Sequence, residues 1–279
     1  MASKKIVQIV LNHPLRINPR ESLSVLRTPP STKTPMLPKT IHYCWFGRNP
    51  LPESAQRCIA SWRKFFPDYQ IIEWNEDNFD VNAIPYTAQA YAARKYAFVS
   101  DFARFQILYD HGGLYFDTDV EVIAPMDDVI ARGPFMGFEI DPRGDKTSVN
   151  PGLGLAAPAG LGLYAEIIEA YKSMQFTRND GSFNTEYAVV RLTTDTLLRH
   201  GLQNAPGIQQ VAGVYIYPAD YFNPFDDATG RLHKTANTRS IHWFSKTWCD
   251  VSPWRTRIAR IAHRFLPLSF CAKVKRLFK

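Results

Sequence analysis

The segment Leu108-Tyr-Asp-His-Gly-Gly-Leu-Tyr-Phe-Asp-Thr-Asp-Val120 decides the fold, because it passes from a helix into a buried strand and ends in two carboxylates. The two glycines end the helical pattern, since glycine is favoured just past a last helical turn. The apolar run Leu114 to Phe116 then predicts a short buried strand. Asp117 and Asp119 follow directly, and in an extended strand they point to the same side.

Two carboxylates that converge at the end of a buried strand repel each other and lose solvation unless a cation lies beside them. Hard oxygen ligands suit Mg²⁺ or Mn²⁺. An isolated D-x-D pattern is more often a solvated turn, so its neighbours matter. Asp101 and Arg104 lie one helical turn apart on the same face. They are either a surface ion pair or part of a site, and the apolar residues around them favour the site.

Short apolar runs alternate with helical patterns on both sides of this segment, which is typical of an α/β protein with a central sheet flanked by helices. Strands are predicted at 40–46, 69–74, 114–116, 135–139, 152–156, 214–217 and 240–243, and helices at 52–65, 88–109, 161–173 and 187–200.

The charge of the chain is concentrated at one end. The formal net charge is +7, but eight Lys or Arg and no acidic residue fall between 255 and 279, and the remaining chain carries 25 basic and 26 acidic residues. A near-neutral body argues against a nucleic-acid partner. The four cysteines form no CxxC pair, so neither a zinc site nor a disulfide framework is indicated.

Three regions are expected. Residues 1–38 form a proline-rich, poorly ordered leader, 39–250 form the folded domain, and 251–279 form a basic amphipathic helical tail. The tail either docks on an anionic membrane surface or packs on the domain. No stretch has the roughly 18 apolar residues of a membrane span. A cytoplasmic protein is therefore expected, with the tail as a peripheral contact to the inner face of the cell membrane.

Several separated motifs together resemble one family. They are Ile41-His-Tyr-Cys-Trp-Phe-Gly47, Ala97-Phe-Val-Ser-Asp-Phe-Ala-Arg-Phe105, the segment quoted first, and Ile241-His-Trp-Phe-Ser-Lys-Thr-Trp248. Over roughly residues 38–250 the chain is similar to the DXD-motif sugar transferases, of the glycosyltransferase family 32 type. That group includes bacterial capsular-polysaccharide transferases and yeast-type initiating mannosyltransferases, and the glucosylating domains of clostridial toxins are distant relatives.

The resemblance implies a single-domain GT-A fold, a Rossmann-like α/β sandwich. It implies a metal-dependent, retaining glycosyltransferase that moves a sugar from a nucleoside diphosphate sugar to a glycan or lipid-linked glycan, in surface or capsular polysaccharide synthesis. The expected metal is Mn²⁺ or Mg²⁺, and a UDP-sugar is expected as donor in preference to a GDP-sugar.

The resemblance also implies roles for particular residues. Trp45 stacks on the nucleotide base, unless it is simply a core tryptophan. Asp101 and Arg104 contact the ribose, the donor sugar or the diphosphate, and a planar guanidinium suits phosphate oxygens. Asp119 binds the metal directly, while Asp117 binds it through water or holds sugar and ribose hydroxyls.

Further donor and metal contacts come from later segments. His242 is implied as a metal ligand, and a nitrogen ligand shifts the preference from Mg²⁺ towards Mn²⁺. Thr247 and Trp248 complete an H-x-x-x-x-[ST]-W pattern at the diphosphate, with Thr247 where relatives usually carry serine. Asn150 aligns with an Asn-Gly segment beside the donor sugar, although Pro151 interrupts the usual pattern.

Glu139, Asp141 and Glu186 are candidate acceptor-side acids, and no side chain is assigned as catalytic base. Two other functions are open on the residues alone. One is a nucleotidyltransferase or hydrolase acting on nucleotide diphosphates, which is disfavoured because GxxxxGK[ST] and GxGxxG loops are absent. The other is a non-enzymatic basic membrane-binding protein.

Overall fold

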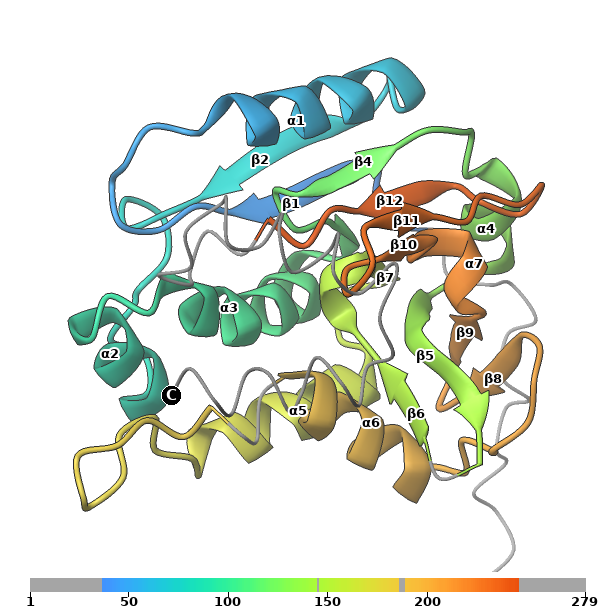
Figure 1. The fold of residues 1–279 in the computed structure, drawn as a ribbon. Helices are drawn as coiled ribbons and strands as arrows, with labels where there is room; N and C mark the ends of the chain where they lie inside the picture. Colours follow the sequence, from blue (N-terminus) through green and yellow to red (C-terminus); the bar gives the residue numbers. More distant parts are fainter. Residues whose placement is uncertain (1–36, 145, 186–188, 246–279) are drawn as a thin grey trace, which may run out of the picture. The chain divides into compact units, whose positions relative to one another are not determined.

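The structure is a computed structural model, and it describes residues 37–144, 146–185 and 189–245. The strands are β1 Thr40–Cys44, β2 Gln70–Trp74, β3 Gly113–Tyr115, β4 Val120–Val122, β5 Phe135–Arg143, β6 Lys146–Val149, β7 Leu155–Ala157, β8 Gln209–Val211, β9 Val214–Tyr217, β10 Phe225–Asp226, β11 Arg231–Leu232 and β12 Ser240–His242 (Figure 1).

The helices are α1 Glu53–Phe65, α2 Pro85–Ala92, α3 Tyr96–His111, α4 Asp127–Arg132, α5 Gly162–Lys172, α6 Val189–Arg199 and α7 Ala219–Phe222, and a 3₁₀ turn, η1, spans Pro151–Leu153. This arrangement confirms the α/β class. Each predicted strand has a counterpart, except that the segment 152–156 is divided between η1 and β7.

A mixed sheet forms the centre of the described residues, in the order β2-β1-β3-β7-β5-β9-β8, with β6 paired to β5. Strands β2, β1 and β3 run parallel, as do β5 and β9. Strand β7 is antiparallel to both of its neighbours and joins these two parallel groups. A separate antiparallel ribbon of β4 and β12 continues the chain just past β3.

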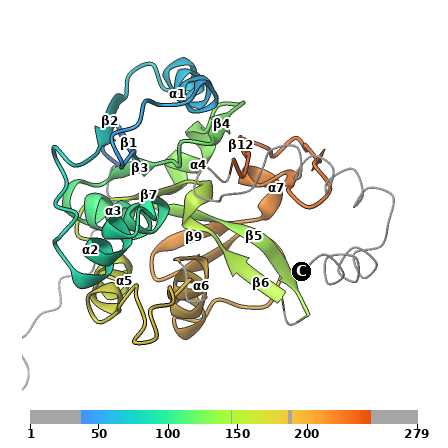
Figure 2. The ribbon, with the colours of Figure 1, turned by 60° about the vertical axis from the view of Figure 1, so that its left-hand side comes forward.

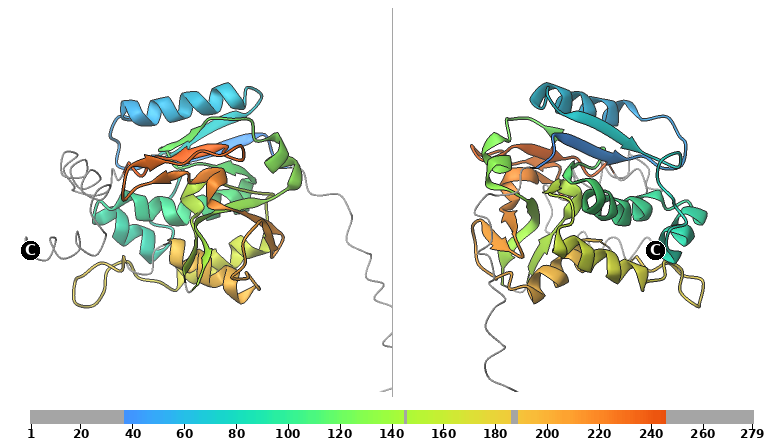
Figure 3. Two further views of the ribbon diagram at one scale, coloured as in Figure 1. Left: turned by 45° about the vertical axis from the view of Figure 1, so that its right-hand side comes forward. Right: turned by 180° about the vertical axis from the view of Figure 1, so that it is seen from behind.

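The sheet has a hydrophobic core on each face, because side chains alternate along its strands. Tyr115 of β3 belongs to the cluster that contains α2, α3, α5 and α6, whereas Leu114 and Phe116 belong to the cluster that contains α1, α4 and α7. Figures 2 and 3 show α1 on one side of the sheet and α3 with α5 on the other. Strand β3, which precedes Asp117 and Asp119, is therefore covered on both faces.

The single helix predicted for residues 88–109 is wrong, because the chain forms two helices there, α2 and α3. Arg94 takes a left-handed conformation with φ of 55°. The N–H of Lys95 donates to the carbonyl of Ala90, and the N–H of Arg94 donates to that of Tyr91. This bond pattern is a Schellman motif, which normally uses glycine. An arginine at this position gave no sequence signal for the break.

Gly112 and Gly113, between α3 and the rest of β3, have different structural roles. Gly112 ends α3 with φ of 65°, and its N–H donates to the carbonyl of Leu108, so the predicted helix stop is confirmed. A Cβ on Gly113 would lie 2.7 Å from the carbonyl oxygen of Thr40. Glycine at this position lets β3 pair closely with β1, which sets where the following carboxylates emerge.

Among the described residues, no helix is both long and apolar enough to cross a membrane. The predicted leader lies, apart from residues 37 and 38, outside the described residues, and the basic tail lies outside them as well. The three-region division stays a prediction.

Candidate functional site

Asp117 and Asp119 follow β3, as predicted, but they lie in a turn between β3 and β4 and the chain is not extended between them. The N–H of Val120 donates to the carbonyl of Asp117 over 3.0 Å and closes this turn. The turn, rather than strand alternation, brings the carboxylates near each other. Unlike a solvated turn, it is partly enclosed, since the side chains of Asp117 and Asp119 are 25% and 16% exposed.

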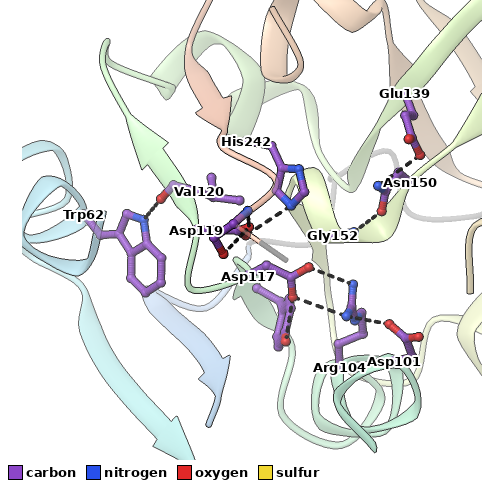
Figure 4. Close-up of polar contacts among 12 residues, drawn as sticks. Trp62, Asp101, Arg104, Asp117, Asp119, Val120, Glu139, Asn150, Gly152 and His242 are labelled. Carbon is purple, nitrogen blue, oxygen red and sulfur yellow. Dashed lines mark hydrogen bonds and ion pairs between the residues drawn. The ribbon is translucent and has the colours of Figure 1, made fainter. Parts of the chain in front are cut away.

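Asp117 is held by residues of α3 and β3 (Figure 4). The Tyr115 hydroxyl donates to Asp117 Oδ1 over 3.1 Å. The guanidinium of Arg104 lies 3.2 Å from Oδ1 through Nη2 and 3.4 Å from Oδ2 through Nη1. Burial raises the pKa of the Asp117 carboxyl, while the Arg104 charge opposes that shift.

Asp101 and Arg104 form a buried ion pair, with 2.8 Å between Arg104 Nη2 and Asp101 Oδ1. Arg104 Nε also donates to the carbonyl of Ser100. Burial raises the pKa of Asp101 to about 7, although Arg104 lowers it in part. The pair is therefore not a surface ion pair. The guanidinium faces four acceptor atoms, the Ser100 carbonyl, Asp101 Oδ1 and both oxygens of Asp117, so most of its N–H groups are engaged within the protein.

Asp119 faces the C-terminal segment of the described chain. Its Oδ1 lies 3.1 Å from His242 Nε2, and its Oδ2 accepts hydrogen bonds from the Ser245 N–H and hydroxyl at 2.8 and 2.9 Å. Burial pushes the pKa of Asp119 upward, but the His242 charge and these bonds lower it well below its usual range. The pKa of His242 is raised, since Asp119 outweighs the effect of burial.

Asp117, Asp119 and His242 can each offer a ligand atom, and the three atoms lie within 4.8 Å of one another. His242 is 7% exposed, and its Nδ1 has no hydrogen-bond partner among the described residues. Two half-buried carboxylates and a buried imidazole with an unpartnered nitrogen fit a divalent cation, and the mixed oxygen and nitrogen set suits Mn²⁺. The structure thus brings together the three residues expected to bind metal.

Asn150 also lies at this site, at the start of η1. Its Oδ1 accepts from the N–H of Gly152 over 2.7 Å, and its Nδ2 donates to Glu139 Oε2 over 3.1 Å. A Cβ added to Gly152 would lie 2.3 Å from Asp117 Oδ2. The segment containing Pro151 therefore packs directly against the carboxylate turn, so the unusual proline does not remove it from the site.

Trp45 follows β1 and is half-buried, with its indole N–H donating to the carbonyl of Asn49 over 2.6 Å. It packs beside the hydrophobic cluster that contains α1. A role in base stacking stays a prediction. Thr247 and Trp248, together with Glu186, lie outside the described residues. Asp141 accepts a hydrogen bond from the N–H of Ala219, at the start of α7.

Sequence reasoning missed Tyr115, Gly152 and Ser245 as parts of the site. Tyr115 stands two positions before Asp117, so strand alternation could have identified it. Ser245 lies within the His242 motif, but the pattern directed attention to Thr247. Nothing in the local sequence signals the contact between Gly152 and Asp117, because it depends on how η1 packs in three dimensions.

A cavity of about 370 Å³ opens beside Asp119. Its lining comes from the start of α1, from β4 and from the segment after β12: Ser54, Arg57, Cys58, Asp119, Glu121, Trp243 and Ser245. The indole N–H of Trp243 donates to Glu121 Oε2 over 2.9 Å. One candidate metal ligand, Asp119, thus borders a space that is large enough for part of a small-molecule substrate.

Comparison with known proteins finds a family match for part of this chain. Residues 52–136 match the family described as "Glycosyltransferase sugar-binding region containing DXD motif". This segment contains Asp101, Arg104, Asp117 and Asp119. The match therefore falls on the part of the chain that carries the carboxylate turn and the buried ion pair.

Two relatives illustrate the similarity. The chain is 29% identical over 119 residues to inositol phosphoceramide mannosyltransferase 1 of Schizosaccharomyces pombe, covering 39% of this chain and 36% of that protein. It is 25% identical over 195 residues to the uncharacterized glycosyltransferase L373 of Acanthamoeba polyphaga mimivirus, covering 67% of this chain and 76% of that one. The chain thus spans only about a third of the length of the yeast relative.

A solved structure described as PaToxG glycosyltransferase superposes with a TM-score of 0.44 at 18% identity, covering 58% of this chain and 69% of that one. A superposition this distant does not identify a substrate.

Proposed function

We propose that this chain, a member of the DXD-containing glycosyltransferase family, transfers a sugar from a nucleoside diphosphate sugar to a hydroxyl of a glycan acceptor. The observation that carries the proposal is the convergence of Asp117, Asp119 and His242 within 4.8 Å, at the end of the strand that the family match covers. Metal dependence, with Mn²⁺ preferred over Mg²⁺, is part of the proposal and is supported by the nitrogen ligand.

Asp119 and His242 would hold the cation, because their facing atoms are 3.1 Å apart and are the most enclosed of the set. A bound divalent cation supplies positive charge that offsets the charge developing on the departing nucleoside diphosphate. Both oxygens of Asp117 face Arg104, and Oδ1 also accepts from Tyr115, so we assign Asp117 to cation-bound water or to hydroxyls of the donor.

Arg104 positions Asp117 and leaves little of its guanidinium for substrate. Four contacts engage it, to Ser100, Asp101 and both oxygens of Asp117. We therefore propose that Arg104 acts on the donor chiefly through Asp117. Arg104 is thus assigned a smaller direct role at the donor than the resemblance implied. Trp45, Thr247 and Trp248 stay proposed donor contacts on the strength of the resemblance alone.

The finer parts of the reaction are also proposals. We propose retention of configuration by a front-face displacement, in which the departing phosphate oxygen takes the proton of the acceptor hydroxyl as the new glycosidic bond forms. A UDP-sugar is proposed as the donor in preference to a GDP-sugar. A glycan or lipid-linked acceptor, a role in surface polysaccharide synthesis and a contact with the inner face of the membrane complete the proposal.

Substitution of Asp119 with alanine tests the function in the full-length protein. Release of nucleoside diphosphate from UDP- and GDP-sugars, with Mn²⁺ present, is expected to fall by roughly 10²- to 10³-fold, because a group that stabilises developing charge is lost. Asp110→Ala, on the exposed end of α3, is the matched control and is expected to keep full activity. Wild-type turnover by Asp119→Ala would refute the assignment.

A screen of sugar nucleotides by thermal shift then identifies the donor. A ligand that binds only the folded protein raises its melting temperature by mass action. The largest shift with Mn²⁺ is expected for a UDP-sugar, and a larger shift with GDP-sugars would overturn that choice. A non-enzymatic membrane-binding protein would show no sugar-nucleotide shift and would be unaffected by Asp119→Ala.

A further inference from the structure

Asn150 links strand β5 to the turn η1 through two side-chain hydrogen bonds. Its Nδ2 donates to Glu139 Oε2 on β5, and its Oδ1 accepts from the Gly152 N–H in η1. Asn150 is 8% exposed, so water cannot readily replace either bond. An ionised carboxylate accepts hydrogen bonds only, which forces the NH₂ group of Asn150 towards Glu139. Glu139 thereby fixes the amide so that its oxygen faces Gly152.

Gly152 is the point at which this bridge reaches the candidate metal site. A Cβ at that position would lie 2.3 Å from Asp117 Oδ2 and 3.3 Å from Arg104 Nη1. The backbone of η1 therefore lies close to both the carboxylate and the guanidinium. Tyr115 and Arg104 restrain Asp117 through polar contacts, and Gly152 lies against Asp117 Oδ2, the oxygen that Arg104 Nη1 faces (Figure 4).

Among the described residues, Asn150 is the side chain that hydrogen-bonds the Glu139 carboxylate. Glu139 forms no ion pair with lysine or arginine in that part of the chain, and its backbone carbonyl, not its carboxylate, accepts from Asn223 Nδ2 over 3.1 Å. Burial raises the pKa of its carboxyl, and the nearby His242 charge and the Asn150 bond oppose that rise. A carboxylate kept in this environment is costly unless it orients something.

We propose that Glu139 is a positioning residue for the cation and donor site, acting through Asn150 and Gly152 on Asp117 and Arg104. The expected effects on turnover rest on the proposed function, whereas the expected effects on the positions of Asn150 and Gly152 do not. It also explains how Asn150 serves the site when Pro151 follows it, since proline at the start of a 3₁₀ turn leaves the Gly152 N–H free to bond Asn150.

The first experiment compares Glu139→Leu, Glu139→Gln and Glu169→Leu, the last being an exposed glutamate on α5 that serves as control. Mn²⁺ affinity is measured on each full-length protein by electron paramagnetic resonance. Glu139→Leu is expected to bind Mn²⁺ about 10-fold more weakly, because loss of a residue that orients metal ligands usually lowers metal affinity by at least this factor. Glu139→Gln, whose amide oxygen can accept from Asn150, is expected to recover most of that loss.

A charge-exchange pair provides a second test if Glu139→Leu fails to fold. In Asn150→Asp no donor faces Glu139, and two carboxylates meet. In Asn150→Asp combined with Glu139→Gln, the glutamine NH₂ donates to the aspartate, whose other oxygen still accepts from Gly152. Mn²⁺ affinity is expected to fall in the single variant and to return towards wild type in the double variant.

The outcomes are distinguishable from those of the proposed function. Wild-type Mn²⁺ affinity in Glu139→Leu, or no recovery in the double variant, overturns the positioning role. If Glu139→Gln loses turnover as completely as Glu139→Leu but binds Mn²⁺ normally, Glu139 acts on substrate directly and the inference is wrong. If the wild type transfers no sugar, the proposed function fails. A crystal structure of Glu139→Leu then decides the inference, which requires that Gly152 move away from Asp117.

Discussion

Alanine at position 152 is a one-methyl perturbation of the site. Gly152 does not use a left-handed conformation, so alanine is allowed by the backbone. Its Cβ would nevertheless lie 2.3 Å from Asp117 Oδ2, where ordinary van der Waals contact begins at 3.4 Å. The carboxylate or the η1 turn must therefore shift by about 1 Å, and the fixed partners Tyr115 and Arg104 resist that shift.

The cost follows from the size of this displacement. A misplacement of about 1 Å at a reacting centre lowers the rate by roughly 10²-fold, which corresponds to about 2.7 kcal/mol of transition-state stabilisation. We expect Gly152→Ala to lower kcat/KM for nucleoside diphosphate release by that factor. Mn²⁺ affinity is expected to fall as well, because Asp117 belongs to the ligand set.

Gly162→Ala is the matched control, because a Cβ there meets nothing within 4 Å and the residue begins α5. It is expected to keep both activity and Mn²⁺ affinity. Both variants are assayed at equal folded fraction, monitored by circular dichroism. If Gly152→Ala retained wild-type activity and wild-type Mn²⁺ affinity, the position of Asp117 described here would not matter to function, and the site would have to be reassigned.

Three further predictions concern stability. His42 is buried with its Nε2 bonded to the carbonyl of Gly112, and burial lowers its pKa to about 4. The unfolded chain binds that proton near pH 6.5, so stability is full above pH 6.5 and about 3 kcal/mol is lost as the pH falls to 4; urea unfolding of His42→Gln is expected to show a shallower loss over this range. Arg94→Gly relieves the left-handed conformation and is expected to raise stability by about 0.5–1 kcal/mol, visible as a higher melting temperature, whereas a lower one would contradict the strain. Trp62→Phe removes the buried indole bond to the Val120 carbonyl at 2.7 Å and is expected to cost about 2–3 kcal/mol in denaturant unfolding, while an unchanged midpoint would show that the bond contributes nothing.

The parts of the fold that the sequence predicts well are those with strong local signals. The amphipathic pattern of α1 places Ala55, Ile59 and Trp62 on a buried face, as the structure shows. The glycines after α3 end that helix where expected. Local signals fail at Arg94, because a left-handed helix end without glycine or asparagine looks like uninterrupted helix.

For the site, the residue types indicated which side chains come together but not the geometry that brings them together. Asp117 and Asp119 were expected to converge, and they do, yet the cause is a hydrogen-bonded turn that alternation along a strand does not predict. Asn150 was expected near the donor from its motif. Its bonds to Glu139 and Gly152 depend on how β5 and η1 meet, and no sequence spacing encodes that meeting.

The pairing of β4 with β12 places His242 opposite Val120, directly beside the carboxylate turn. Ser245, which bonds Asp119, stands 126 positions later in the chain. The ribbon itself has only three residue pairs, and the ion pair between Arg239 and Asp128 lies next to it. A cation held by Asp119 and His242, as proposed, would add a reversible link between these distant segments. On the proposed function, cation binding is expected to slow amide hydrogen exchange in β12, which links occupancy of the site to the local stability of a strand far away in the sequence.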